Sequence, residues 1–167
     1  MRHDEEVYLV ANIAEEVGQL LQERRLTLGV VESATGGLIA HLITNIAGSS
    51  AYFRGAVVAY HNEVKTGVVG VSKATLDRYG AVSSRVAEEM ARGGKKLLGV
   101  GICLSDTGIA GPGGATPQKP VGLFYLGLAY GDKAYSRKQT FAGDRRENKA
   151  SVADAALEWL RECLKTI

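Results

Sequence analysis

The order of short apolar runs and helical segments constrains the fold of this chain most strongly. Five runs have the length and composition of strands: 27–32 ("TLGVVE"), 53–60 ("FRGAVVAY"), 99–105 ("GVGICLS"), 121–130 and 133–142. The first three alternate with helical segments, which favours parallel pairing. Only two residues, Gly131 and Asp132, separate the last two, which indicates an antiparallel hairpin. The sequence therefore predicts a mixed five-stranded sheet covered by helices on both faces.

Two helices are predicted in the first third of the chain. Residues 4–25 form an amphipathic helix, whose inward side chains are Val10, Ile13, Ala14, Val17, Leu20 and Leu21. Residues 36–46 form a second helix, whose inward side chains are Leu38, Ala40 or Ile39, Leu42 and Ile46.

The later helices carry recognisable starts and breaks. Gly67 and Gly70 break the segment after the second strand into short helical pieces, and Ser83 or Ser84 caps the helix "RVAEEMARGGKKLL". Asp144 caps the last helix, whose inward stripe is Val152, Ala153, Ala156, Leu157, Leu160 and Leu164.

Length and composition limit the class of protein. A chain of 167 residues fits one domain, residues 1–167, and can bury one sizeable core. The formal charge of +2 gives no argument for a nucleic-acid or membrane partner. Cys103 and Cys163 are expected to be reduced thiols. With no membrane-length apolar run and no secretion signal at the N-terminus, we expect a cytoplasmic protein.

Three polar segments follow predicted strands: Glu32–Gly37, Tyr60–Lys65 and Ser105–Pro120. In an open α/β sheet, ligands bind outside the carboxyl ends of the parallel strands, where the connecting loops meet. The sequence therefore predicts that these segments meet in one site.

Ser33 and Lys65 are candidates for a nucleophile and its base. Ser33 lies at a helix start, where an N-cap worth about 1 kcal/mol is the alternative explanation. Lys65 can serve as the base if burial lowers its pKa, and a solvated surface lysine is the alternative. A triad of Ser33 with His61 and Asp106 is equally open at this point. No histidine stands at metal-ligand spacing from a cysteine or carboxylate, so no metal site is expected.

The stretch "SDTGIAGPGGATPQKPVG" at 105–122 can present main-chain N–H groups to a phosphate or another anion. It matches neither the Walker pattern nor the dinucleotide fingerprint, and an ordered surface loop is the alternative. Arg145 and Arg146 could clamp a phosphate or simply face solvent.

The chain resembles the C-terminal domain of the competence/damage-inducible CinA-type proteins. The resemblance rests on "ESATGGLIA", "IAGSSAYFRGAVVAYHNEVK", "LGV", "YGAVS", "TGIAGPGGATPQKPVG" and "FAGDRRENK", in this order, and extends from about residue 7 to the last helix. It implies an α/β fold, a three-layer α/β/α sandwich on a mixed, mostly parallel five-stranded sheet. It also implies hydrolysis of the carboxamide of nicotinamide mononucleotide, without metal or cofactor. Ser33 would be the nucleophile, Lys65 the base and Tyr60 its hydroxyl partner. The positions expected to bind substrate are Glu32, Thr35, Gly36, Gly37, Thr107, Gly108, Ala110, Gly111 and Arg145.

Two positions depart from the family pattern: Ala34 stands where many members have cysteine, and His61 where many have serine. Activities of the N-terminal domain of CinA-type proteins, which resembles molybdopterin-binding folds, are not expected here. Two other functions stay open, a non-catalytic pyridine-nucleotide-binding module and an amidohydrolase for another small amide. We expect a homodimer or higher homo-oligomer, with Tyr52 and Phe53 as exposed apolar candidates for its surface.

Overall fold

The computed structural model describes the backbone of residues 2–167 and the side chains of residues 12–167, so Val10 of the predicted stripe lies outside the described side chains. The elements, in chain order, are α1 (Arg2–Glu23), β1 (Leu28–Glu32), α2 (Leu38–Thr44), the 3-10 turn η1 (Ser49–Ala51), β2 (Phe53–Val58), α3 (Asn62–Val64), the π-helical turn η2 (Lys65–Val69), α4 (Lys73–Tyr79), α5 (Ser84–Leu98), β3 (Ile102–Gly108), β4 (Leu123–Tyr130), β5 (Lys133–Thr140) and α6 (Arg145–Thr166).

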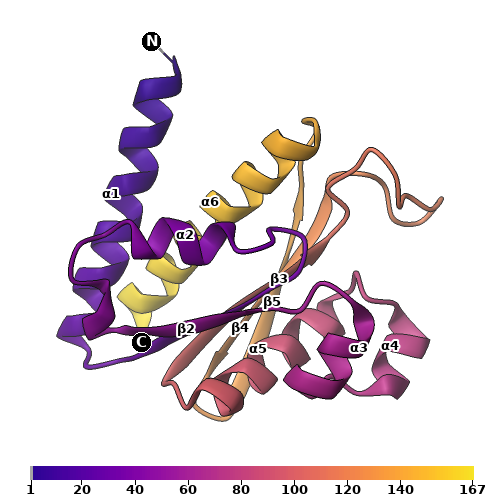
Figure 1. Ribbon diagram of the computed structural model, residues 1–167, viewed down its shortest axis with the longest axis horizontal. Coiled ribbons are helices and arrows are strands. Elements are labelled where there is room, and N and C mark those ends of the chain that lie inside the picture. The colour runs from indigo at the N-terminus through magenta and orange to yellow at the C-terminus, as the bar shows by residue number, and fades with distance from the viewer. Residues whose placement is uncertain (1) are drawn as a thin grey trace.

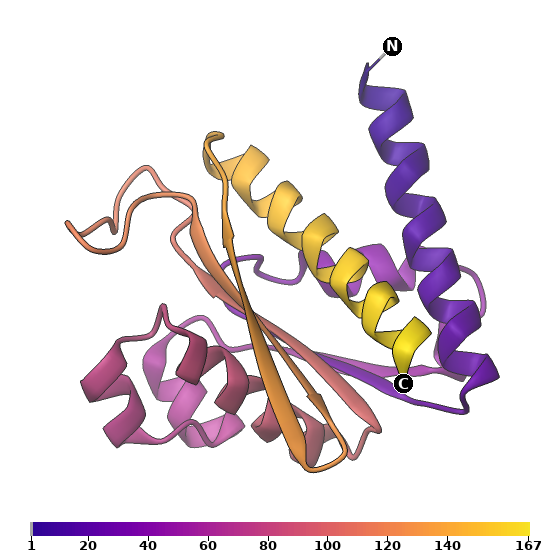
Figure 2. The ribbon, with the colours of Figure 1, turned by 180° about the vertical axis from the view of Figure 1, so that it is seen from behind.

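The strands form one five-stranded sheet in the order β2-β1-β3-β4-β5. β1 pairs in parallel with β2 and β3, and β4 pairs antiparallel with β3 and β5, so β4 alone runs in the opposite direction. Helices α1, α2 and α6 cover one face, and α3, α4 and α5 cover the other (Figures 1 and 2). The predicted three-layer sandwich on a mixed sheet is confirmed.

Side-chain alternation divides the core between the two faces of the sheet. All five residues of the interior strand β1 are buried, because helices cover it on both sides. Val30 and Leu104 pack into the larger cluster under α1, α2 and α6, whereas Val31 and Cys103 pack into the smaller cluster under α5. The predicted inward stripe of α6 is confirmed, with all six side chains 0% exposed.

Helix α5 lies unusually close to the sheet. A Cβ added to Gly94 would lie 2.2 Å from Cγ2 of Val31, closer than atoms can pack. Ser83 caps this helix by accepting a hydrogen bond from the N–H of Val86, which confirms Ser83 and not Ser84 as the predicted cap. The lack of a side chain at Gly94 therefore brings α5 against β1.

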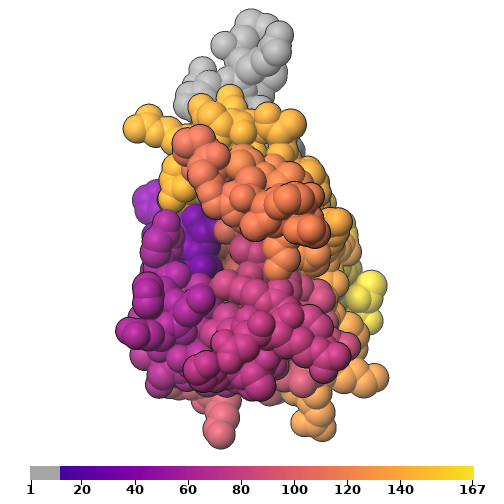
Figure 3. All heavy atoms as spheres, turned by 90° about the vertical axis from the view of Figure 1, so that its right-hand side faces the viewer, coloured from indigo at the N-terminus to yellow at the C-terminus, as the bar shows by residue number. Residues whose placement is uncertain are grey.

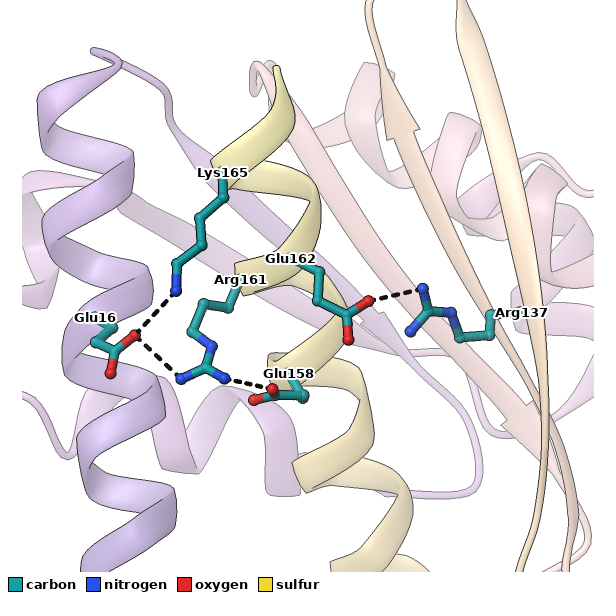
Figure 4. Close-up of polar contacts among 6 residues, drawn as sticks. All are labelled: Glu16, Arg137, Glu158, Arg161, Glu162 and Lys165. Atoms are coloured by element: carbon teal, nitrogen blue, oxygen red, sulfur yellow. Dashed lines mark hydrogen bonds and ion pairs between the residues drawn. The ribbon is translucent and has the colours of Figure 1, made fainter.

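Ion pairs connect α1, α6 and β5 on the outer face (Figure 4). Glu16 of α1 accepts from Arg161 at 3.1 Å and lies 3.7 Å from Lys165, both on α6. Arg161 also pairs with Glu158, and Arg137 of β5 pairs with Glu162 at 2.8 Å. Partly exposed pairs of this kind contribute less than about 1 kcal/mol each. They orient helices that the apolar core already holds.

Three predicted elements differ from the structure in detail. In α2 the fully buried side chains are Ile39 and Ile43, while the other predicted inward residues are only partly buried at the cluster edge. Gly67 lies inside η2 and does not break it, whereas Gly70 ends it at a φ of 84°. Strand β3 begins later than predicted and extends to Gly108, because its last residues pair with β4.

Tyr52 is not on the surface, so the prediction that it is exposed is wrong. Its side chain is 2% exposed and packs under α1, where a Cβ on Gly18 would lie 2.5 Å from the Tyr52 hydroxyl oxygen. Cys103 and Cys163 are both free thiols, as predicted. Among the described helices, none combines the length and apolar character that crossing a membrane requires.

Candidate active site

The three polar segments meet at one edge of the sheet, as predicted. β1, β2 and β3 are parallel, so their carboxyl ends lie together. A pocket of about 190 Å³ opens there, lined by Ser33, Ala34, Tyr60, Asn62, Lys65, Ala81, Val82, Thr107, Gly108, Ala110 and Arg145. Figure 3 shows this end of the molecule, with a hollow between the magenta helical segment and the orange loop.

Ser33 and Lys65 are in direct contact at the floor of the pocket. Lys65 Nζ lies 3.0 Å from Ser33 Oγ, and it also donates to the carbonyl oxygens of Ala59 at 2.7 Å and Tyr60 at 3.0 Å. His61 caps a helical turn after β2, and this turn directs the Lys65 side chain back toward the strand end. Lys65 is 2% exposed and Ser33 8%. The alternative that Lys65 is a solvated surface lysine is therefore excluded.

The environment of Lys65 favours the neutral amine. Burial lowers the pKa of Lys65 below its ordinary value, because the ammonium ion loses its hydration. The nearby Asp106 carboxylate opposes this change by attracting the positive charge, but its effect is the smaller one. The protonation of Lys65 thus depends on a balance between burial and one carboxylate.

Tyr60 contacts Lys65 through its main chain. Its side chain is 62% exposed, and the hydroxyl accepts a hydrogen bond from Arg145 at 3.1 Å. Among the described residues no hydrogen bond joins this hydroxyl to Lys65 or Ser33. The main-chain carbonyl of Tyr60, and not its hydroxyl as expected, therefore contacts the Lys65 amine.

The alternative triad through His61 is wrong. The His61 ring is exposed, and its Nδ1 accepts from the N–H of Glu63 at 3.3 Å. Asp106, the proposed acid of that triad, is 0% exposed and bonds to the turn that follows β1. Solvent rather than Ser33 surrounds the imidazole, because His61 lies outside the pocket as a helix cap.

Glu32 and Thr35 support the site from inside the protein. Glu32 is 0% exposed and accepts from the N–H groups of Gly37 at 2.8 Å, Ile39 at 3.1 Å and Ala40 at 2.8 Å, so it caps α2. Thr35 is 1% exposed and donates its hydroxyl within this cluster. Both were expected to bind substrate; their enclosure assigns them to the support of the serine turn.

Gly36 and Gly37 shape the turn between Ser33 and α2. Their φ angles are 64° and 104°, a region that residues with a side chain rarely adopt. Gly36 is exposed, and a Cβ there would lie 3.5 Å from Nζ of Lys149. The turn therefore presents bare backbone toward α6.

Asp106 is the residue whose role sequence reasoning missed. Its carboxylate accepts from three successive main-chain N–H groups: Ser33 at 3.1 Å, Ala34 at 3.0 Å and Thr35 at 3.3 Å. Complete burial, with a contribution from the charge of Glu32, raises the pKa of Asp106 to about 6. A polar triplet, "SDT", at the end of an otherwise apolar strand was the signal that could have found it.

The glycine-rich segment after β3 forms the far wall. Thr107 donates to the carbonyl of Ala81 at 2.8 Å, and Arg145 donates to the carbonyl of Gly111 at 2.8 Å. Asn148, 0% exposed on α6, donates to the carbonyls of Ala110 at 3.1 Å and Gly143 at 2.8 Å, and it accepts from the Gly143 N–H. This wall is therefore attached to α6 by side-chain hydrogen bonds.

A second compartment of about 590 Å³ adjoins the pocket and shares Ala110 and Arg145 with it. Its other lining residues are Gly111, Pro112, Val121, Gly143, Asp144 and Arg146. The first amides of α6 are not free to bind an anion there, because the Asp144 carboxylate accepts from two of them. An anion would instead meet side-chain cations. Within residues 12–167 no group of three histidine, cysteine or acidic residues could hold a metal ion.

A family model of the CinA C-terminal domain matches residues 10–164. A CinA-like protein of Leptospira borgpetersenii serovar Hardjo-bovis is 55% identical over 117 residues, which are 70% of this chain and 28% of that protein. A CinA-like protein of Salinibacter ruber is 47% identical over 148 residues, 89% of this chain and 36% of that protein. The chain therefore spans well under half the length of these curated relatives.

Solved structures agree with these sequence matches. A CinA superfamily protein of Klebsiella pneumoniae superposes with a TM-score of 0.91 at 28% identity, covering 95% of this chain and 99% of that one. A competence/damage-inducible protein of Agrobacterium tumefaciens has a TM-score of 0.89 at 34% identity, covering 93% and 95%. These names refer to competence, damage or CinA and specify no reaction.

Proposed function

The chain belongs to the CinA C-terminal domain family, and we propose that it catalyses the reaction that its family resemblance implies, the hydrolysis of the carboxamide of nicotinamide mononucleotide to nicotinic acid mononucleotide and ammonia. Ser33 is the nucleophile and Lys65 its general base. One observation carries the proposal: a buried lysine amine lies 3.0 Å from a serine hydroxyl at the floor of a pocket. A pure binding module has no need of this contact.

The hydrogen bonds of Lys65 suit both of its protonation states. A neutral amine has two N–H donors and one lone pair. The carbonyls of Ala59 and Tyr60 accept the two donors, which leaves the lone pair to accept the Ser33 hydroxyl proton. The ammonium form can donate to all three oxygens without moving. A group placed in this way can take and return a proton during one turnover.

The reaction then proceeds in two steps. Lys65 takes the Ser33 proton as Oγ attacks the carboxamide carbon, and the C–N bond breaks as the nitrogen receives that proton and leaves as ammonia. Water, deprotonated by neutral Lys65, next attacks the acyl-serine ester. The Ser33 oxygen recovers the proton, and nicotinic acid mononucleotide is released.

The oxyanion needs donors other than the amides of the serine turn. The N–H groups of residues 33–35 all donate to Asp106, so none of these three amides is available to the oxyanion. In the β3–β4 ladder, Ile109 donates to Leu123, so Gly108 next to it points its N–H away from β4. That side lies beyond the end of β1, at the pocket. We assign the Gly108 N–H to the oxyanion.

The dimensions and charges of the site support a nucleotide substrate. The inner pocket of about 190 Å³ is below the range of about 300–1,000 Å³ typical of ligand sites, but the adjoining compartment extends it well into that range. The nicotinamide group would occupy the inner pocket beside Ser33. Arg145, at the boundary, and Arg146, which also lines the adjoining compartment, would bind the phosphate.

The decisive experiment measures ammonia release from nicotinamide mononucleotide by the purified, metal-stripped protein. Ser33→Ala and Lys65→Met should reduce release to background, while Ser49→Ala, in the distant turn η1, keeps the wild-type rate. Binding of the nucleotide without ammonia release by the wild type would refute the proposal in favour of a binding module. Faster turnover of another small amide than of nicotinamide mononucleotide would identify that amide as the better substrate.

A further inference from the structure

Asp106 connects the serine turn to a neighbouring strand. Residues 33–35 follow β1, and Asp106 lies 71 to 73 residues later on β3. Its three hydrogen bonds to successive N–H groups are buried, so water cannot replace them. This carboxyl group therefore helps to set the position of Ser33 relative to Lys65.

The contacts of Thr35 show that the carboxyl cluster has room for one extra proton. Thr35 Oγ1 lies 2.5 Å from Glu32 Oε2 and 2.5 Å from Asp106 Oδ1. A hydroxyl has only one proton and can donate to only one of these oxygens. The contact of Thr35 Oγ1 with the second carboxyl group is favourable when that carboxyl group is protonated and donates a hydrogen bond to Thr35. Asp106 can carry this proton, because burial and the charge of Glu32 together raise its pKa to about 6.

The charged groups that act on or with Asp106 come from two other elements. Glu32 approaches from the end of β1, and Lys65 from the helical turn after β2. The segment before α5 contributes only apolar lining to the pocket. The carboxylate whose charge acts on Lys65 is that of Asp106, which favours the ammonium form of the lysine.

We propose that Asp106 is a positioning residue that fixes Ser33 through the main chain and competes with Lys65 for a single proton. In one arrangement Asp106 is ionised and Lys65 is an ammonium ion. In the other the proton is on Asp106, bonded to Thr35, and Lys65 is the neutral base of Ser33. This inference rests on the proposed roles of Ser33 and Lys65. It adds that the carboxyl cluster of Asp106, Thr35 and Glu32 determines how often the base is available.

Two charge-removing substitutions should shift the titration of Lys65 in opposite directions. Asp106→Asn removes the carboxylate that attracts the ammonium ion, so the midpoint for Lys65 should fall by about one pH unit or more. Glu32→Gln removes the charge that favours protonation of Asp106, so Asp106 is ionised more often and the midpoint should rise by a smaller amount. A purely structural role for both residues predicts no such opposition.

The midpoint is measured by NMR of protein labelled at the lysine Cε carbon, with Lys65→Met to assign the signal. This readout needs no turnover, so it stands even if nicotinamide mononucleotide is not hydrolysed. Where hydrolysis is observed, the acidic limb of kcat/KM should move with the NMR midpoint in each variant. Unchanged midpoints in Asp106→Asn and Glu32→Gln, or shifts in the same direction, would overturn the proposal. If Asp106→Asn does not fold, an unchanged or lower midpoint in Glu32→Gln overturns it alone.

Discussion

Replacement of Asn148 by alanine tests how the far wall of the pocket is held. The buried amide makes three hydrogen bonds, to the carbonyls of Ala110 and Gly143 and from the N–H of Gly143, at 3.1, 2.8 and 3.0 Å. At about 1 kcal/mol each, their loss should lower the free energy of unfolding by about 3 kcal/mol. For a chain of this length the Tm should fall by roughly 6–12 °C.

The assay is thermal unfolding followed by calorimetry, with activity measured on the same samples. Asn148→Asp keeps the size and the acceptor but cannot donate to the two carbonyls, so it should also be destabilised. Asn45→Ala, on the exposed end of α2, is the matched control and should change stability by less than about 0.5 kcal/mol. A Tm of Asn148→Ala within about 2 °C of wild type would refute the reasoning. Asn148→Ala should also raise KM. Arg145 donates to the segment next to Ala110, so loosening this segment would displace Arg145 from the substrate.

Gly94→Ala should destabilise the protein by about 1–3 kcal/mol in urea denaturation, because the new methyl group would overlap Val31, whereas Gly67→Ala, with open space around it, should be neutral or slightly stabilising. The raised pKa of Asp106 means that the folded state binds its proton more tightly than the unfolded state, so this contribution to stability is complete below about pH 4 and is lost as the pH rises through about 6. Relative to Asp106→Asn, wild-type stability should thus fall by about 2 kcal/mol between pH 4 and 7, and a parallel pH dependence of the two proteins would contradict this. Arg145→Met should raise KM for nicotinamide mononucleotide more than for the riboside that lacks the phosphate. Equal increases for the two compounds would show that Arg145 does not bind the phosphate.

Much of the fold could be predicted because its signals are local. The periodicity of α6, its cap at Asp144 and the two-residue hairpin turn each depend on a few neighbouring residues. The site could be placed for a related reason. Parallel strands end at one edge of a sheet, so the polar residues that follow β1, β2 and β3 must meet, although the rule did not decide between Lys65 and His61 as the partner of Ser33.

The sequence by itself thus determined the layers, the hairpin and the residues that gather at the strand ends. Only the tertiary structure decided which polar atoms pair. The register of β3 places Asp106 beneath the serine turn, where its carboxylate accepts from the main-chain amides of that turn. Because of the fold of the turn after β2, Lys65 donates to the carbonyl of Tyr60 and not to its hydroxyl. Packing under α1 buries Tyr52. Such pairings depend on positions far apart in the chain, and a shift of one residue in register would turn each side chain to the opposite face of the sheet.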